Sequence, residues 1–330
     1  MNVTIKDVAR TANVSVATVS RVLNNKKNVS EEAVQAVNRA VKELGYSPNI
    51  LGRDLRKSET KRILAIAGTE GQNYNDILRG MQDEAYKDGY DVLVASTRCD
   101  PDHEMHLLGM LFSHAVDGAV LLAPKLDSRT ISDLSRRYKV AVCPERLDVD
   151  GLLCATIDNE RAGYDAVSYL ISKGCRRIGL ITASDCGLSI SDREKGYHRA
   201  LSEAGINFDP DLVYRGEYAT DTGTKGCEQF MSLRNKPDAI FAVSDTIAVG
   251  AMTYAVQRGI TIGRDLLFFG FDNIAYSHMF IPKLSTVEQP CYLQGKTIIE
   301  KLILNIKNEV QDKTTYLLPH SLILRESTGD

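Results

Sequence analysis

Residues 15–24, with the sequence Ser-Val-Ala-Thr-Val-Ser-Arg-Val-Leu-Asn, place an uncommon set of side chains on one predicted helix. Val19, Val22 and Leu23 recur at helical spacing, which predicts a buried stripe. The other side presents Val16, Ala17, Ser20, Arg21 and Asn24. Methyl-bearing side chains can contact thymine methyl groups, and an arginine can bind the edge of guanine through two hydrogen bonds. This side of the helix is therefore suited to contacting base edges in the DNA major groove.

A first predicted helix precedes this one and would hold it in place. Thr4 and Asp7 have the spacing of a capping box for a helix that runs to about Ala12. Asn13 stands at the turn, because asparagine tolerates the left-handed backbone conformation. Ser15 can then cap the second helix through its hydroxyl group.

A third helix is predicted to begin after Ser30 and to end at Gly45, with Pro48 close behind. Three short helices with a tight turn between the first two are typical of the helix-turn-helix, whose second helix enters the major groove. A three-helix bundle without any ligand would have the same spacing.

The charge distribution separates this N-terminal segment from the rest of the chain. Residues 1–58 hold ten lysines and arginines against five acidic residues, whereas residues 59–330 hold 30 against 38. A basic segment joined to an acidic remainder favours a polyanion as the partner of the basic segment alone. A solvated charged surface would not by itself predict this division.

The chain from residue 61 onward alternates strand-like apolar runs with helical stretches, which is the pattern of parallel, helix-covered sheets. We therefore expect an all-α head and an α/β body of two doubly wound parallel-sheet lobes. A join between the lobes is expected near residues 155–159, and residues 285–289 and 317–324 are expected to cross back between them. The predicted strands lie at 63–67, 92–95, 119–123, 140–143, 178–181, 213–214, 240–243 and 266–271.

The body lacks the motifs of nucleotide-dependent and hydrolytic enzymes. The sequence contains no GxGxxG dinucleotide loop, no GxxxxGK[ST] phosphate loop and no GxSxG nucleophile elbow. No histidine stands in an HExxH context, and no two cysteines are spaced as CxxC. We therefore expect no catalytic residues, no bound metal and no cofactor.

The seven cysteines, at positions 99, 143, 154, 175, 186, 227 and 291, are scattered and odd in number. This distribution indicates buried thiols in a reducing compartment and not a disulfide framework. Residues 1–7 carry no apolar signal region, and no apolar run approaches the roughly 20 residues that span a bilayer. We expect a cytoplasmic protein without membrane contact.

The segments 4–9 and 14–24 resemble the N-terminal motif of the LacI/GalR family of repressors, although the family often has glycine in place of Asn13. The resemblance implies that the partner of the head is double-stranded operator DNA. It assigns base contacts to Val16, Ala17 and Arg21. The other DNA-binding residues that we expect in the head are Thr4 and, nearer the phosphates, Ser15, Thr18 and Asn24.

Residues 49–60 connect the head to the body, and two interpretations of them remain. A segment this short is compatible with a flexible linker, whereas the resemblance implies a hinge helix that folds when a dimer binds DNA. In the family a leucine that matches Leu55 wedges into the minor groove. Gly52 stands where the family usually has alanine, and this difference costs roughly 1 kcal/mol of helix propensity. The sequence therefore predicts a hinge that is less preorganised than usual.

The body resembles the two-lobed sugar-binding-protein fold that the family uses as its regulatory domain, in which ligands lie outside the carboxyl ends of the strands. The match is carried by an RxxG segment at 193–196, an [NS]DxxAxG segment at 244–250 and a G-[FY]-D segment at 270–272, and residues 286–289 align with the strand that closes the cleft in the family. It implies polar effector contacts at Arg193, Ser244, Asp272 and Gln289. An arginine and a carboxylate can each hold two neighbouring hydroxyls. A surface or interlobe ion pair is the alternative for Arg193 and Asp272.

Four further residues match positions close to the effector in relatives: Asn73, Tyr74, Glu145 and Tyr218. Asn73 and Tyr74 follow the first strand of the body, Glu145 ends the fourth strand, and Tyr218 follows the strand near residue 214. A place in the core or on the surface is equally compatible with these four.

These observations together predict a transcription regulator, most simply a repressor, that binds a pseudopalindromic operator as a homodimer. A small-molecule effector is expected to control it allosterically. The hydroxyl-suited contacts and Tyr218 favour a sugar, and a nucleobase or nucleoside acting as co-repressor is the alternative. The expected organisation is a head at 1–48, a linker at 49–60 and a body at 61–330, with lobe 1 at 61–158 and 290–316 and lobe 2 at 159–289 and 317–330.

Two other classes of protein share parts of this pattern. A solute-binding protein with an oligomerising head is disfavoured by the basic head and by the lack of an export signal. A sugar-processing enzyme is disfavoured by the absence of catalytic motifs.

Overall fold

The computed structural model describes residues 3–23, 29–46, 59–68, 72–184, 187–309 and 314–330. The chain forms two compact units, Met1–Thr60 and Lys61–Asp330. Each unit has its own apolar core, and the two are described separately below.

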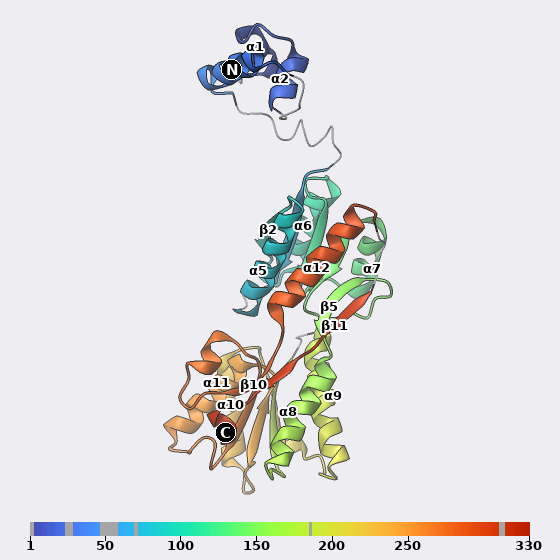
Figure 1. The fold of residues 1–330 in the computed structure, drawn as a ribbon. Helices are drawn as coiled ribbons and strands as arrows, with labels where there is room; N and C mark the ends of the chain where they lie inside the picture. The colour runs from blue at the N-terminus through green and yellow to red at the C-terminus, as the bar shows by residue number, and fades with distance from the viewer. Residues whose placement is uncertain (1–2, 24–28, 47–58, 69–71, 185–186, 310–313) are drawn as a thin grey trace. The chain divides into compact units, whose positions relative to one another are not determined.

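The described part of the N-terminal unit contains α1 (Ile5–Thr11), α2 (Val16–Leu23) and α3 (Glu31–Leu44), as Figure 1 shows in blue. Asp7 Oδ2 accepts hydrogen bonds from the backbone N–H of Thr4 at 3.0 Å and from its hydroxyl at 2.7 Å, which confirms the capping box. Asn13 lies at φ 51°, in the left-handed region, as predicted for the turn.

The second and third helices also begin and end as their sequences predict. Ser15 Oγ accepts from the N–H of Thr18 at 3.1 Å, and Ser30 Oγ accepts from the N–H of Ala33 at 3.4 Å. Gly45 closes α3 at φ 59°, a conformation that glycine adopts without steric cost. The helices enclose a small core of valines and alanines, among them Val8, Val19 and Val37.

Lobe 1 of the C-terminal unit contains a six-stranded sheet in the order β11-β5-β4-β3-β1-β2, in which every described pairing is parallel. Helices α5 and α12 lie side by side on one face, and α6 and α7 cover the other (Figure 1). The strands are β1 (Arg62–Ala67), β2 (Asp91–Ser96), β3 (Gly118–Leu122), β4 (Val140–Val142), β5 (Leu153–Ile157) and β11 (Thr315–Leu318). The helices are α5 (Gln72–Lys87), α6 (Pro101–Phe112), α7 (Ser128–Arg137) and α12 (Cys291–Ile306).

Two glycines allow α5 and α12 to approach closely. A Cβ atom on Gly80 would lie 2.1 Å from the carbonyl oxygen of Tyr292, and a Cβ atom on Gly295 would lie 1.9 Å from that of Ile77. Any larger residue at either position would force the helices apart. This contact fixes the first turns of α12 against α5.

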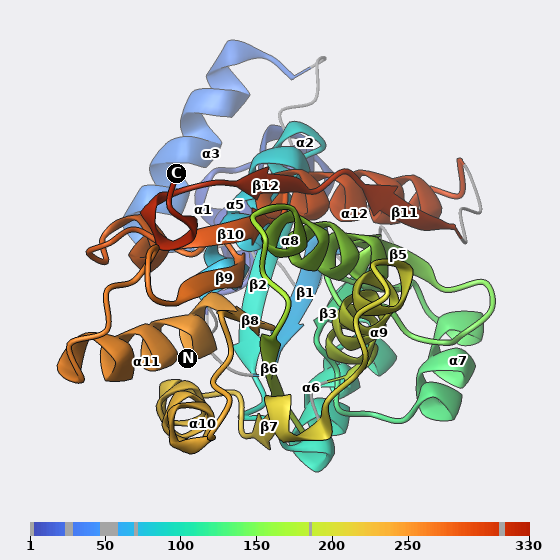
Figure 2. The ribbon, with the colours of Figure 1, turned by 90° about the horizontal axis from the view of Figure 1, so that it is seen from below.

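Lobe 2 contains the second sheet, in the order β12-β10-β9-β8-β6-β7. Figure 2 shows α8 and α9 on one side of this sheet and α10 and α11 on the other. The strands are β6 (Ile178–Ala183), β7 (Val213–Gly216), β8 (Ala239–Ala242), β9 (Leu267–Asp272), β10 (Ser285–Glu288) and β12 (Ser321–Ile323). The helices are α8 (Asn159–Ser172), α9 (Gly187–Glu203), α10 (Thr220–Ser232) and α11 (Asp245–Gln257), with short 3₁₀ turns η1 (Pro210–Leu212), η2 (Ala275–His278) and η3 (Glu326–Thr328). The edge strand β12 runs antiparallel to β10, so lobe 2 is not entirely parallel.

The first two crossings between the lobes lie at the expected lobe boundaries. Residues 153–157 form β5 within the lobe 1 sheet, and lobe 2 begins after Asp158, which caps α8, so the crossing lies within the expected join at 155–159. Residues 285–288, part of the segment expected to cross, form β10 in the lobe 2 sheet, and the crossing follows at Gln289 and Pro290, at the expected boundary 289/290.

The third crossing corrects the expected lobe boundary at 316/317. Leu317 and Leu318 pair with Thr156 and Ile157 and therefore belong to the lobe 1 sheet. Pro319 follows, and because proline has no N–H to donate, the strand ends there. The next strand, β12, already lies in lobe 2.

Five of the predicted buried thiols are free and buried, namely Cys143, Cys154, Cys175, Cys227 and Cys291. Cys99 is exposed, contrary to the prediction, because it lies in the turn after β2 at φ 61°. Cys186 lies outside the described residues. Within the described part of the chain, no helix combines the length and apolar character required to cross a membrane.

Candidate functional site

The outer side of α2 presents the residues that the sequence assigns to base contacts. Val16 is 42% exposed, and Ala17 and Arg21 are exposed, whereas Val19 and Val22 are buried against α1 and α3. An apolar side chain such as Val16 at the start of an exposed helix has no packing role in the head. Its exposure is compatible with contact to a thymine methyl group.

Arg21 makes no ion pair or hydrogen bond with any other residue that the structure describes. Its guanidinium therefore keeps its five N–H donors for an external acceptor. Ser15 and Thr18 lie at the start of α2, with their hydroxyl oxygens 2.9 Å apart, and Thr4 stands at the start of α1. Asn24 and Leu55, also predicted to bind DNA, lie outside the described residues.

Arg193, on α9, is buried at the carboxyl ends of the lobe 2 strands. Its Nε donates to Asn159 Oδ1 at 3.0 Å, and its Nη1 donates to the carbonyl oxygen of Val243 at 2.6 Å. Nη1 also lies 3.5 Å from Asp272 Oδ1, and the guanidinium stacks over the ring of Phe271 at 3.6 Å. The Arg193–Asp272 pair is therefore a buried contact within lobe 2, neither on the surface nor between the lobes.

Asp272 is the residue on which the predicted effector contacts of lobe 2 converge. Its Oδ1 accepts from Gln289 Nε2 at 2.7 Å, and its Oδ2 accepts from the Tyr218 hydroxyl at 3.0 Å. Its backbone lies at φ 110°, which is strained for any residue with a Cβ atom. Strain of this kind persists where the surroundings impose it, and it gathers at functional sites.

The segment after Asp272 is held by a network of hydrogen bonds. Asn273 Nδ2 donates to Glu288 Oε1 at 2.9 Å, and Arg325 Nη2 donates to Asn273 Oδ1 at 2.7 Å. Asp245 accepts from the N–H of Ile274 at 3.0 Å, and burial raises the pKa of this carboxyl well above its usual range. These contacts fix the turn that imposes the strained backbone of Asp272.

Tyr218 and Ser244 lie beside this group in different roles. The Tyr218 residue is 45% exposed, but burial of its hydroxyl, together with the charge of Asp272, raises its pKa well above the usual range. Tyr218 is thus partly available to a ligand. Ser244 is fully buried and caps α11 by accepting from the N–H of Ile247 at 3.3 Å, so it also has a structural role.

The lobe 1 residues lie on the other side of the cleft between the lobes. Glu145 Oε1 accepts from the backbone N–H of Ser189 in lobe 2 at 2.8 Å, and the neighbouring Arg146 forms a 3.1 Å ion pair with Asp192. Burial raises the pKa of Glu145, while the Ser189 N–H and the charge of Arg193 oppose this rise. Glu145 therefore stands at a direct contact between the lobes.

Tyr74 and Asn73 belong to the first turn of α5. Tyr74 packs against the core of lobe 1, and burial raises the pKa of its hydroxyl, with the nearby charge of Glu145 adding to the effect. Tyr74 thus lies in the core of lobe 1, which was the alternative to an effector contact, and it is also close to the cleft. The side chain of Asn73 lies outside the described part of the structure.

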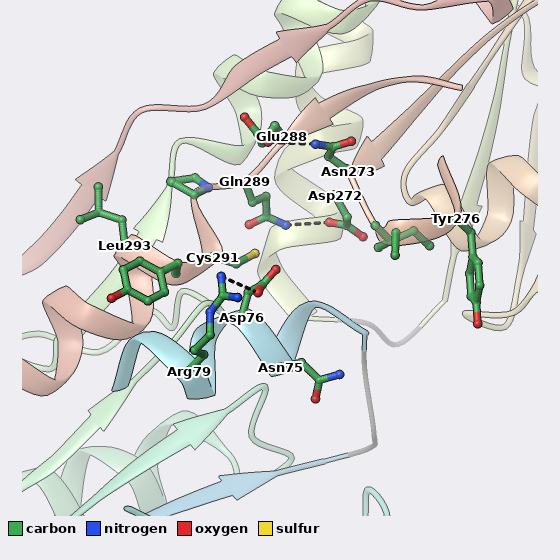
Figure 3. Close-up of a pocket in the computed structure, with 14 residues that line it drawn as sticks. Asn75, Asp76, Arg79, Asp272, Asn273, Tyr276, Glu288, Gln289, Cys291 and Leu293 are labelled. Atoms are coloured by element: carbon green, nitrogen blue, oxygen red, sulfur yellow. Dashed lines mark hydrogen bonds and ion pairs between the residues drawn. The ribbon is translucent and has the colours of Figure 1, made fainter. Parts of the chain in front are cut away.

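A pocket of about 680 Å³ opens between α5 and the ends of β9 and β10 (Figure 3). Figure 3 shows Gln289 bonded to Asp272 on one side, with Asp76 and Arg79 of α5 facing them. Asp272 and Gln289 are the predicted effector residues that line this pocket. Arg193 does not line it, but it forms the ion pair with Asp272. Its wall consists of Asn75, Asp76, Arg79, residues 272–276 and residues 288–293.

Several residues of the site were not predicted. Asn159 and Phe271 hold the guanidinium of Arg193, and Cys291 and Arg79 line the pocket. Phe271 stands inside the G-[FY]-D segment, so the motif contained a signal for it. Asn159 lies at the expected join between the lobes and belongs to no recognised motif. It accepts a hydrogen bond from Arg193 only because the fold packs α9 against the start of α8.

The arrangement is suited to binding and not to covalent chemistry. A ligand hydroxyl can donate to the Asp272 carboxylate and accept from an arginine or amide N–H. Among the described residues, no group of three or more His, Cys, Asp and Glu side chains could hold a metal ion. A helix-turn-helix head and a two-lobed domain with polar groups at its strand ends define a ligand-responsive transcription regulator.

Comparison with known proteins agrees with this class. Residues 4–49 match the family of bacterial regulatory proteins called the lacI family, and residues 167–328 match a periplasmic binding protein-like domain. The chain is 36% identical to the HTH-type transcriptional regulator RegA of Clostridium saccharobutylicum, over 99% of this chain and 100% of RegA. It is 32% identical to the HTH-type transcriptional repressor PurR of Aliivibrio salmonicida, over 98% of each chain. The chain belongs to the lacI family, and it is a transcriptional regulator and not an enzyme.

Two solved structures resemble the whole chain. The Lac repressor dimer bound to operator and the anti-inducer ONPF gives a TM-score of 0.86 at 26% identity, with 99% of both chains covered. The complex of the transcriptional regulator CelR with cellobiose gives a TM-score of 0.75 at 27% identity, with 99% of this chain and 100% of CelR covered. These matches confirm the predicted family and the fold of a helical head followed by two α/β lobes.

Proposed function

We propose that this repressor binds a pseudopalindromic operator as a homodimer in the cytoplasm and that a sugar bound in the cleft changes its operator affinity. The observation that carries the effector part is the convergence of Arg193, Gln289 and Tyr218 on the strained Asp272. A guanidinium, an amide and a phenol gathered around one carboxylate offer both donors and acceptors, and they suit a ligand with several hydroxyl groups, because each hydroxyl can both donate and accept. The exposed part of Tyr218 provides an apolar surface for a sugar ring.

The homodimer is supported by an exposed apolar group in lobe 2. Tyr276, Met279 and Ile281 are 54%, 63% and 87% exposed, and they lie within six residues of one another in the chain. Large apolar side chains gathered on a surface mark interaction sites. A second copy of the chain is the occupant we infer, since a pseudopalindromic operator requires a two-fold symmetric partner.

The effector class is tested by thermal unfolding of the full-length protein with D-ribose, D-glucose, maltose, cellobiose, adenosine and guanine. A bound ligand at a hundredfold excess over its Kd stabilises the fold by about 2.7 kcal/mol. For a domain of this size the Tm should rise by roughly 5 °C or more. We expect this rise with a sugar. A rise with adenosine or guanine alone would contradict the sugar and favour the nucleobase alternative.

Replacing Arg21 by alanine should remove discrimination between the operator and random DNA. A bidentate contact between an arginine and guanine is worth roughly 1–3 kcal/mol of discrimination, or about 5- to 150-fold. The measurement is fluorescence anisotropy of labelled operator and of a shuffled sequence of the same length.

Arg39→Ala is the matched control for Arg21→Ala, because Arg39 is an exposed arginine on α3. The control should leave the ratio of the two DNA affinities unchanged. An equal loss of affinity for both DNAs with Arg21→Ala would show that Arg21 contacts only phosphates.

A further inference from the structure

An ion pair joins the two lobes of the C-terminal unit beside the cleft. Arg146 follows β4 in lobe 1, and its Nη2 donates to Oδ2 of Asp192, on α9 of lobe 2, at 3.1 Å. The Arg146 side chain is 40% exposed, whereas the Asp192 side chain is only 12% exposed. Because the carboxylate is shielded from water, salt screens this pair less than a fully exposed pair. A charge-assisted hydrogen bond therefore holds the lobes together at this point.

A second contact between the lobes lies one residue away. Glu145 Oε1 accepts from the backbone N–H of Ser189, in the first turn of α9, at 2.8 Å. A Cβ atom on Gly187 would lie 2.8 Å from the same oxygen, so a side chain there would displace the carboxylate. The φ of 78° at Gly187 also favours glycine. Two neighbouring residues of lobe 1 thus bind the start of α9, and we call Glu145, Arg146, Ser189 and Asp192 the interlobe clasp.

Asp192 has a second cationic partner, which lies in its own lobe. Lys195 Nζ is 2.6 Å from Asp192 Oδ1, three residues along the same helix. Each oxygen of this carboxylate therefore has one cation beside it. Of the two bonds, the one to Arg146 joins the lobes and the one to Lys195 does not. Lys195 thus offers a matched comparison on the same carboxylate.

The interlobe clasp lies next to the candidate effector residues but outside the pocket. Asp192 directly precedes Arg193, which pairs with Asp272. Among the described residues that line the pocket of about 680 Å³, none belongs to the clasp. A change at Arg146 therefore leaves the wall of the pocket intact, and it can affect a bound ligand only through the positions of the lobes.

We propose that the Arg146–Asp192 pair keeps the two lobes in the arrangement in which the cleft is complete, and that it thereby preorganises the cleft for the effector. The wall of the pocket comes from both lobes, with Asp76 and Arg79 in lobe 1 and Asp272 in lobe 2. A ligand that contacts both lobes binds only molecules in which they are in place, so its apparent affinity scales with the fraction of such molecules. The clasp raises this fraction. This inference rests on the proposed function for the ligand and adds a contact outside the pocket that controls the cleft.

The first test needs no ligand and measures hydrogen–deuterium exchange of the full-length protein by mass spectrometry. Ser189 belongs to the first turn of α9, where backbone N–H groups have no carbonyl partner within the helix. Its exchange therefore reports how often the bond to Glu145 opens. In Arg146→Met, which removes the charge and keeps an unbranched side chain, exchange of residues 187–190 should be at least about threefold faster. Lys195→Met is the matched control and should exchange at the wild-type rate.

The second test measures sugar affinity by calorimetry. The ligand is cellobiose, or whichever of D-ribose, D-glucose and maltose the wild type binds most tightly. Its affinity should fall about three- to tenfold in Arg146→Met and in Asp192→Asn, the usual size of a coupling between residues in contact. The double variant should bind no more weakly than Asp192→Asn alone, because both changes remove the same bond. Lys195→Met should stay within twofold of the wild type.

Each test has a result that would overturn the proposal. Unchanged exchange in Arg146→Met, or an equal increase in Lys195→Met, would show that the ion pair does not hold the lobes together. A sugar affinity of Arg146→Met within twofold of the wild type would show that the pair does not preorganise the cleft. Additive losses in the double variant would show that Arg146 and Asp192 act separately. If the wild type binds none of the four sugars, the proposed effector class fails, and the exchange result alone decides whether the pair holds the lobes together.

Discussion

With Arg193 replaced by alanine, operator binding should no longer respond to the effector, while the operator affinity of the unliganded protein stays unchanged. The guanidinium is buried and lies between Asn159, the Val243 carbonyl and Asp272. Loss of a charge-assisted contact to the effector costs about 1.5–3 kcal/mol, or roughly 10- to 150-fold in affinity. Because the coupling between two binding sites is reciprocal, a variant that cannot bind effector keeps one operator affinity throughout the titration.

The measurement is a fluorescence-anisotropy titration of labelled operator, with and without effector at a concentration that saturates the wild type. The phenotype depends on the sign of the effect: constant repression for an inducer and constant derepression for a co-repressor. Arg199→Ala, six residues along α9, is the matched control, because Arg199 pairs with Glu160 on the surface. This control should respond like the wild type.

A loss of stability is expected alongside the loss of response. Removing one partner of a buried ion pair leaves an uncompensated charge, here on Asp272, and typically costs about 3–5 kcal/mol. Wild-type operator affinity of Arg193→Ala would show that the variant is folded under the conditions of the titration. A response with the wild-type midpoint would place Arg193 outside the effector site and weaken the assignment of Asp272 with it.

The parts of the fold that follow from local physics could be predicted from the sequence. The caps at Thr4, Ser15 and Ser30 require only residues three positions apart, and the left-handed turns at Asn13 and Gly45 depend on a single residue each. Each of these predictions is confirmed because no distant contact opposes it.

The last lobe crossing could not be placed from the sequence, because it depends on pairing between distant strands. Within the segment 317–324, Leu318 pairs with Ile157 in lobe 1 and Leu322 pairs with Val287 in lobe 2. Only Pro319 gave a local indication of the division.

The candidate site shows the same distinction. Arg193, Asp272 and Gln289 stand in recognisable segments, and the structure brings them together as the resemblance implied. Asn159 has no such segment, because its importance lies in the arginine that α9 places beside it. The strained φ of Asp272 is likewise a property of the folded turn and not of the residue type.

Operator affinity should fall steeply with salt, because neutralised phosphates release their condensed counterions. Lys6, Arg21, Arg39 and Lys42 are exposed on the head, and a dimer presents each of them twice. If about six phosphates are neutralised per dimer, the logarithm of the affinity should fall against the logarithm of salt concentration with a slope near −5. Between 50 and 200 mM potassium chloride this slope amounts to a loss of roughly a thousandfold.

The control for this salt dependence is the affinity for a neutral sugar, measured by calorimetry over the same salt range. Arg193 and Asp272, which we propose as sugar contacts, are buried, and salt screens buried groups much less than exposed ones. We therefore expect the sugar affinity to change little while the operator affinity falls. A slope near zero for the operator would contradict DNA binding by the basic head. If the sugar affinity fell in parallel with the operator affinity, salt would be destabilising the fold, because both kinds of binding require the folded protein.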